Sequence, residues 1–482
     1  MSIHIIDLLI FIVYLLAMLG IGVYFMLKNS SKEDYYVGGR SMSAGQIGLS
    51  AVATDVGGGF SIGLGGLGFI MGLSGSWMLF TGLLGAWLSA VILIPKIYPI
   101  AKTNKFLTFP QSLAFHYNSK VALIAGIISL IGYVGFTSSQ LLAGAKLASA
   151  TFPSITIGNA ILIMGVIAVA YTTIGGIKAV IYTDVVQWII LMVGLIFIGI
   201  PIGYFKLGGW QAISNSLPNE FFTLTNISFV QLFNWFITIV PIWFVGMTLY
   251  QRIYACKDKK TAQKAWYIAG FFEWPIMAFM GIILGMFAKI ALEQGMFANI
   301  GFAAGANIDP ELGLPLLLRT ILPIGLMGVM MAAYFSAIMS TADSCIMAAS
   351  GNLTTDILGH FKGKLSKLNI KYSQIITLLI GVFAVLLATN MQNVLELMLY
   401  SYAFMVSGLL VPVIGTLTVK NPSPLAAIMA MIFGGGTTLT LILLNKELPL
   451  GLDANFFGIS ISSIMFLFFQ LYSRKNKSRK LT

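Results

Sequence analysis

The sequence contains few charged residues, few cysteines and few histidines. Charged side chains make up 9% of the 482 residues, whereas apolar side chains make up 58%. A soluble protein carries about 25% charged residues, so this chain cannot cover a water-exposed surface and lipid must be the solvent for most of it. The apolar runs are long and continuous rather than alternating, which favours membrane-spanning helices.

The few cysteines and histidines exclude several kinds of chemistry. Cys256 and Cys345 are far apart and form no C-x-x-C motif, so we expect neither a disulfide nor a metal site from them. The three histidines are isolated and form no H-E-x-x-H motif. The sequence offers no nucleophile–base pair either, and it therefore predicts a protein that is not an enzyme.

The net charge is +12, but the basic residues lie in short loops between apolar spans. This placement predicts an orientation in the membrane rather than nucleic-acid binding. With the N-terminus outside, the inside segments hold nearly all Lys and Arg residues, including Arg252. The exceptions are Lys146, Lys206, Lys289, Arg319 and Lys446. We therefore expect the N-terminus outside and a cytoplasmic C-terminus, with the lipid bilayer as partner and no obligate protein partner.

The lengths of the apolar runs predict an all-α polytopic membrane protein with about 13 transmembrane helices. An odd number of spans agrees with termini on opposite sides of the membrane. The predicted spans are 4–27, 45–71, 75–95, 121–150, 156–175, 181–205, 229–250, 265–292, 314–350, 372–390, 395–419, 424–445 and 456–472.

Two of these spans contain helix-breaking residues. In the second, Asp55 is followed by Gly57, Gly58 and Gly59, and each glycine costs about 1 kcal/mol in a helix relative to alanine. In the seventh, Pro241 is followed by Gly246. The two spans are five positions apart in the series of spans, and paired broken helices at matching positions of inverted repeats are typical of transporter binding sites. The alternative is that these residues produce ordinary kinks or close helix packing.

Acidic residues within the spans are functional hypotheses, because an acid at mid-helix costs about 2.5–3.5 kcal/mol. Asp55 is the strongest, since it adjoins the predicted break. Asp184 lies near the inner end of its span, where the membrane interface is the alternative. For Glu273, Asp343 and Glu396, a hydrogen bond to a neighbouring helix remains the alternative to a functional role.

Hydroxyl groups cluster in the ninth span, in the run SAIMSTADS. Ser340 and Thr341 can hydrogen-bond to their own helix, or they can supply hard oxygen ligands to a small cation. Unwound backbone carbonyls of the second span could then supply further oxygens to the same cation.

Four segments together resemble the sodium:solute symporter family. They are VGGR at 37–40, YTTIGGIKAVIYTDVVQ at 171–187, QRIYACKD at 251–258 and SAIMSTADS at 336–344. The resemblance implies a leucine-transporter-like core of two inverted five-helix repeats, with broken first and sixth core helices. It divides the chain into an N-terminal helix and loop (1–44), a first repeat (45–225), a second repeat (226–420) and two C-terminal helices with a basic tail (421–482).

The resemblance also implies a sodium site and coupling residues. Backbone carbonyls and side-chain hydroxyls would hold Na⁺, and two acids would couple its movement to the solute. The implied sodium ligands are Ala53, Val56, Ala337, Ser340 and Thr341, and the implied coupling residues are Asp55 and Asp184.

The solute is expected to be small and organic, with an amino acid such as proline first. The resemblance extends to both the proline-carrier and the choline-carrier branches. Choline, a sugar or a carboxylate remain alternatives, as does a sodium-independent facilitator of the same fold. The residues expected at the solute are Gly57, Gly58, Phe60, Phe136, Gln140 and Trp243. The family resemblance implies residence in a bacterial inner membrane.

Overall fold

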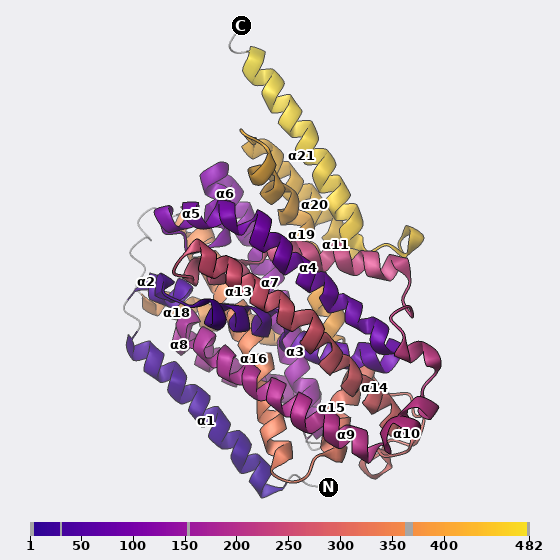
Figure 1. Ribbon diagram of the computed structural model, residues 1–482. Coiled ribbons are helices and arrows are strands. Elements are labelled where there is room, and N and C mark those ends of the chain that lie inside the picture. Colours follow the sequence, from indigo (N-terminus) through magenta and orange to yellow (C-terminus); the bar gives the residue numbers. More distant parts are fainter. Residues whose placement is uncertain (1–3, 29–30, 152–154, 362–369, 480–482) are drawn as a thin grey trace.

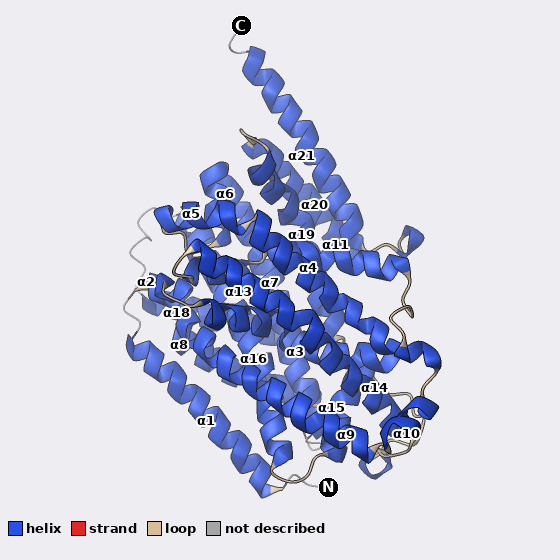
Figure 2. Cartoon of the chain, in the orientation of Figure 1, coloured by secondary structure: helices blue, strands red, loops and turns tan. Residues whose placement is uncertain are grey.

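The computed structural model describes residues 4–28, 31–151, 155–361 and 370–479, and these are almost entirely helical (Figure 1, Figure 2). Within these ranges no β-strand occurs, and one isolated bridge pairs Met42 with Cys256. The predicted all-α class is confirmed.

The helices of the first half follow the apolar runs closely. They are α1 (Ile5–Lys28), α2 (Lys32–Val37), α3 (Ala44–Met71), α4 (Trp77–Ile92), α5 (Ile94–Asn104), α6 (Phe109–His116), α7 (Ser119–Thr151), α8 (Ile157–Gly194), α9 (Ile200–Lys206) and α10 (Gly209–Ser216). A π-helical segment, η3 (Leu195–Gly199), joins α8 to α9.

The second half begins with the bent pair α11 and α12 and ends with the long helix α21. Its helices are α11 (Phe229–Val245), α12 (Met247–Ala255), α13 (Lys259–Phe272), α14 (Phe279–Glu293), α15 (Pro310–Ile321), α16 (Leu326–Gly351), α17 (Leu358–Phe361), α18 (Ile370–Ala388), α19 (Val394–Thr418), α20 (Pro424–Leu444) and α21 (Ala454–Arg479). The π-helical segments η5 (Glu273–Ala278) and η7 (Asn352–Ile357) interrupt its longest spans.

The lengths and apolar composition of the helices make this chain an integral membrane protein. Among the described residues, ten helices are long and apolar enough to cross a membrane, or eleven if the bent pair α11–α12 forms one span. The start of α1 and the end of α21 lie at opposite ends of the molecule (Figure 1). The total of thirteen spans and the side on which each terminus lies stay predictions.

The ninth predicted span, 314–350, was wrong in its extent. The structure divides it into α15 and α16, which are separated by residues 322–325. Pro323 cannot donate a backbone hydrogen bond, and Gly325 has φ +87°, which side-chain-bearing residues rarely adopt. The apolar run is therefore a short helix, α15, followed by the longer apolar helix α16.

The innermost helix is α16, whose span is buried almost throughout. It packs against α3, α7 and α8, and α7 also packs against α19 (Figure 1). In contrast, most apolar side chains of α1, α18, α20 and α21 are exposed or half-buried rather than buried. This distribution is that of a membrane protein, with lipid-facing helices around a core that contains the polar residues.

Both predicted helix breaks are present. In α3 the break falls at Gly57, with φ +24° and ψ −164°. In the seventh span the helix continues through Pro241 and ends at Val245, and α12 begins after Gly246 with a bend of 42°. A third break, at Gly176 inside α8, falls where the predicted spans 156–175 and 181–205 are separated.

Candidate functional site

The break in α3 lies directly against α16, where the hydroxyl cluster was found. The Thr341 hydroxyl donates to the carbonyl of Ala53 at 3.2 Å, and it is also 3.4 Å from the carbonyl of Ala337. Three of the five predicted sodium ligands thus meet in one hydrogen-bonded unit. The other two, Val56 and Ser340, are fully buried in the same two helices.

The glycines of the break allow this close approach. A Cβ atom on Gly57 would lie 1.9 Å from Thr341 Oγ1, and one on Gly58 would lie 2.0 Å from Ile338 Cγ1. Neither contact can be accommodated, so only glycine allows the α3 backbone to reach α16 here. Both glycines therefore shape the predicted ion site, and neither has a side chain to offer a solute.

Asp184 is fully buried in α8 and forms an ion pair. Arg252 Nη2 lies 2.9 Å from Asp184 Oδ2, and Ser50 donates to the same oxygen at 2.5 Å. The guanidinium also donates to Ser50, to the hydroxyl of Thr54 and to Ser344. The network joins α3, α8, α12 and α16. Ser340 lies next to the carboxylate of Asp184.

Arg252 was counted from the sequence among the loop cations, and the structure corrects this. It lies within α12 and its side chain is fully buried. The guanidinium is planar and offers five donors, so it can bond several oxygens at once in a buried site.

Further polar contacts close the same end of the molecule, which the orientation prediction assigns to the cytoplasm. Met42 and the end of α12 exchange backbone hydrogen bonds, from Met42 N to Ala255 O at 3.0 Å and from Lys257 N to Met42 O at 3.3 Å. The Tyr98 hydroxyl donates to Cys256 O at 2.9 Å. The second half of the broken seventh span is thereby fastened to the segments before α3 and in α5.

An ion-pair cluster closes the opposite end. Lys146 of α7 lies 2.5 Å from Asp309 Oδ2 and 2.7 Å from Glu311 Oε2. Glu311 also accepts hydrogen bonds from the backbone N–H groups of Val394 and Leu395, at 3.1 and 3.0 Å. A carboxylate is favourable at a helix N-terminus, and the cluster therefore ties α15 to both α7 and the start of α19. Lys146 and Asp309 also line a cavity of about 730 Å³.

An aromatic group connects Asp55 to α7 and α19. The Tyr402 hydroxyl donates to Asp55 Oδ1 at 3.1 Å, and its ring packs edge-on against Phe136 with centroids 4.9 Å apart. One turn before Phe136, the Tyr133 hydroxyl lies 3.1 Å from the hydroxyl of Thr248, just after the α11–α12 break. The predicted solute residue Phe136 thus lies between the two broken helices.

The other predicted solute residues are placed differently. Trp243 is fully buried and packs edge-on against Trp266, and a Cβ on Gly85 would lie 2.5 Å from it. These contacts with α4 and α13 favour core packing over solute contact. Gln140 is buried in α7, and its amide donates to Ser139 at 3.3 Å. The side chain of Phe60 lies outside the described residues.

The remaining acids divide into buried and exposed groups. Glu396 is exposed and accepts hydrogen bonds from Asn393 and Tyr400, so it has a local role at the start of α19. Asp343 is fully buried in α16. Glu273 is also fully buried, and its side chain lies next to that of Asp55.

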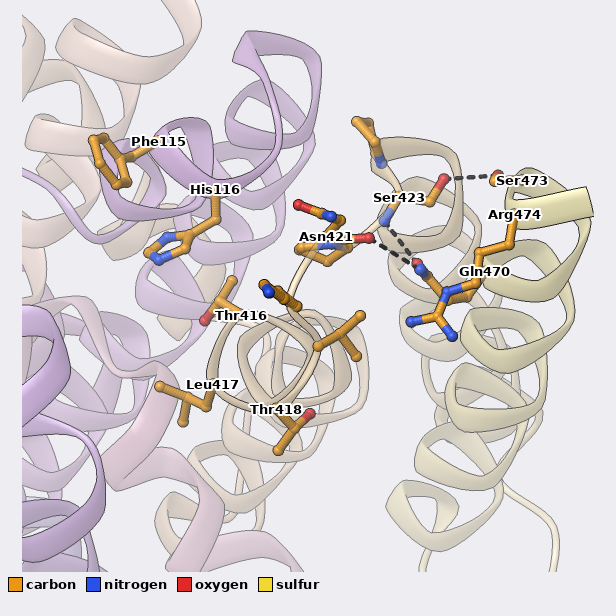
Figure 3. A pocket seen from close by; sticks show the side chains of 14 residues that line it. Phe115, His116, Thr416, Leu417, Thr418, Asn421, Ser423, Gln470, Ser473 and Arg474 are labelled. Carbon is orange, nitrogen blue, oxygen red and sulfur yellow. Dashed lines mark hydrogen bonds between the residues drawn. The ribbon is translucent and has the colours of Figure 1, made fainter. Parts of the chain in front are cut away.

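A separate cavity of about 990 Å³ lies far from the broken helices, where α6 and the ends of α19, α20 and α21 meet (Figure 3). His116, Lys420 and Arg474 line it, and Gln470 bridges it by hydrogen bonds with Asn421 and Ser423. None of the predicted site residues contributes to this cavity, so it is not the candidate transport site.

Sequence reasoning missed Tyr402 and Lys146 as site residues. Tyr402 is 347 positions from its partner Asp55, and nothing in its local sequence marks it. Lys146 did carry a signal, because it is a basic residue within an apolar span. Such a residue is costly unless it is paired, so a buried partner could have been sought.

Comparison with protein families gives one match over most of the chain. The profile described as "Sodium:solute symporter family" matches residues 35–434. Among curated relatives, the high-affinity proline transporter PutP of Bacillus subtilis is 27% identical over 88% of this chain and 89% of its own. The sodium/proline symporter of Salmonella typhimurium is 26% identical (82% and 79%), and the sodium/glucose cotransporter of Vibrio parahaemolyticus is 28% identical (73% and 68%).

Comparison with solved structures supports the fold. A Na⁺-coupled sialic acid symporter in its substrate-bound outward-open state superposes with a TM-score of 0.77, at 21% identity and 96% coverage of both chains. Mhp1, a nucleobase-cation-symport-1 family transporter in a closed conformation, gives a TM-score of 0.56 at 15% identity, covering 92% of this chain and 95% of its own.

Proposed function

Because the chain belongs to the sodium:solute symporter family, and is thus a transporter rather than an enzyme, we propose that it is a sodium-coupled symporter that imports a small organic solute by alternating access. The observation that carries this proposal is the hydrogen bond from Thr341 to Ala53 across the break in α3. It brings a hydroxyl and two carbonyl oxygens together at membrane depth, which a sodium-independent facilitator would not need.

The proposed sodium site uses five oxygens, which suits a small hard cation. They are the carbonyl oxygens of Ala53, Val56 and Ala337 and the hydroxyls of Ser340 and Thr341. The ion would replace the hydrogen bonds that Thr341 now makes, so its binding would hold α3 and α16 in one relative position. The two five-helix repeats expected from the family would supply the moving parts.

Asp55 and Asp184 are proposed to couple the ion to the solute. Asp184 lies next to Ser340, and Arg252 now neutralises it. An ion leaving the site toward the cytoplasm would pass this carboxylate, and Arg252 would have to move before a path opened. Asp55 is bonded to Tyr402, which contacts Phe136, so a solute against these rings would be sensed at the break beside the ion.

The two closed ends support alternating access. Lys146 with Asp309 and Glu311 fastens one end, and Arg252 with Asp184 fastens the other. The driving force suffices for accumulation, because one charge moving through 100 mV yields about 2.3 kcal/mol. A tenfold sodium gradient adds about 1.4 kcal/mol. Together they allow a few-hundredfold accumulation per coupled ion.

For the solute we propose an amino acid such as proline first. Two relatives are proline carriers, although another is a sodium/glucose cotransporter. The rings of Phe136 and Tyr402 could bind the apolar face of proline or of another compact solute. All these relatives are bacterial, which supports residence in the inner membrane of a bacterium, with the C-terminus in the cytoplasm.

Uptake into proteoliposomes tests the proposal. Labelled proline, choline, glucose, sialic acid, pantothenate and a monocarboxylate are supplied with an inward sodium gradient or with potassium in its place. Uptake of one solute only in sodium is the expected result. Equal uptake in both salts would identify a facilitator, and the hydroxyls of Ser340 and Thr341 would then serve helix packing alone.

A further inference from the structure

Glu273 occupies an unusual position in its helix. It begins the π-helical segment η5 between α13 and α14, and Pro275 follows two residues later without a backbone donor. π-helical turns are uncommon and often occur at functional sites. The side chain is fully buried, although an acid at this depth is costly.

The carboxyl group of Glu273 faces that of Asp55. The two side chains lie next to each other, from η5 and from α3 just before its break. On its other side Glu273 lies against α4, where a Cβ on Gly82 would be 2.0 Å from Oε2. Glycine at this position therefore leaves the space that the carboxyl group occupies.

Positive charge is missing around this pair. Within the described part of the chain, Tyr402 donates one hydrogen bond to Asp55 Oδ1, while Asp55 Oδ2 and both oxygens of Glu273 receive none. The buried basic side chains of this part are Lys146 and Arg252, and both are bound to other acids. Two adjacent carboxylates buried without a cation are unfavourable, so a positive group between them would stabilise their charged form.

We infer that Asp55 and Glu273 together bind the positively charged amine of the transported solute. This inference rests on the proposed symport function and narrows it to solutes that carry an amine, such as amino acids, rather than neutral sugars or plain carboxylates. The surroundings suit an organic cation, because the Tyr402 hydroxyl donates to Asp55 and the Tyr402 ring packs against Phe136. Aromatic faces attract such cations, whereas the hydroxyls and carbonyls on α16 and α3 suit sodium.

Matched solute pairs provide the test, because each pair differs mainly in its amine. The pairs are L-proline and tetrahydrofuran-2-carboxylate, choline and 3,3-dimethylbutan-1-ol, and glucosamine and glucose. Sodium-driven uptake and competition are measured in proteoliposomes with the wild type, Glu273→Gln and Glu396→Gln. The last variant is the control, since Glu396 is exposed and bonded only near its own helix end.

The wild type is expected to prefer the amine-bearing member of a pair by about tenfold to a hundredfold, as for a hydrogen bond to a charged group. Glu273→Gln should lose most of that preference and the control should keep it. Should Glu273→Gln fail to fold, Glu273→Asp keeps the carboxyl group on a side chain that is one methylene shorter. This variant should fold and show a reduced preference for the amine-bearing solute.

Three results would overturn the inference. Sodium-driven uptake of a solute without an amine would leave the symport proposal standing and remove the amine site. An unchanged amine preference with a higher half-saturating sodium concentration in Glu273→Gln would assign the pair to a second sodium ion. An unchanged preference with altered dependence on external pH would assign it to a shared proton. The absence of sodium-driven uptake for every solute would instead refute the proposed function itself.

Discussion

The substitution Thr341→Val tests the sodium site most directly, because it removes the hydroxyl and keeps the branched shape. The hydroxyl is 3.2 Å from Ala53 O and 3.4 Å from Ala337 O in a fully buried setting. A hydrogen bond or ligand contact to a charged partner is worth about 1.5–3 kcal/mol. At 1.4 kcal/mol per tenfold, the half-saturating sodium concentration should rise about tenfold to a hundredfold.

The assay is solute uptake into proteoliposomes as a function of external sodium. Thr341→Ser keeps the hydroxyl and should remain within a few-fold of the wild type. Thr438→Val is the matched control, since this buried threonine lies in α20, away from α3 and α16, and donates to Ala454 O at 3.4 Å. If Thr341→Val and Thr341→Ser required the same sodium concentration, the hydroxyl would not be a ligand and the site would be wrong.

Three other substitutions examine the parts around the site. Gly57→Ala should abolish sodium-dependent uptake, because its Cβ would lie 1.9 Å from Thr341 Oγ1. Gly436→Ala is the control and should leave uptake unchanged, because no atom lies within 4 Å of its Cβ. Near-normal uptake by Gly57→Ala would contradict the close packing. Lys146→Met removes the cation of a buried ion-pair cluster, which costs about 3–5 kcal/mol of stability. A cysteine introduced at Leu142 should then react faster with an impermeant thiol reagent. Lys120→Met, on the same helix but exposed, should not change that rate. Arg252→Gln should lower the melting temperature of the purified protein, because it leaves Asp184 buried and unpaired. The double variant Arg252→Gln/Asp184→Asn should recover much of the lost melting temperature. If the two substitutions lowered the melting temperature additively, the pair would not be coupled.

The sequence predicted the class of protein and the break in α3 because these depend on local physical properties. A low charge content and long apolar runs require lipid as solvent, and three glycines after Asp55 require a break in α3. The hydroxyls of Ser340 and Thr341 were recognisable as candidates because polar groups buried in an apolar helix are costly unless they bind a partner. These inferences needed no knowledge of which helices are neighbours.

Other features depended on contacts between distant parts of the chain. Arg252 resembled a loop cation because basic residues at span ends are usually topogenic, but the fold buries it against Asp184. The run at 314–350 resembled one span, because apolar length alone does not distinguish one long helix from two helices joined by a turn at Pro323 and Gly325.

What the sequence alone determined is therefore the solvent of this protein, its helical class, the break beside Asp55 and the presence of buried acids. Only the tertiary structure decided which charges meet: Arg252 with Asp184, Lys146 with Glu311, and Glu273 with Asp55. The reason is physical. Burial cost is a property of one residue in its own helix, whereas its compensation by a partner depends on helices that pack together from hundreds of residues apart.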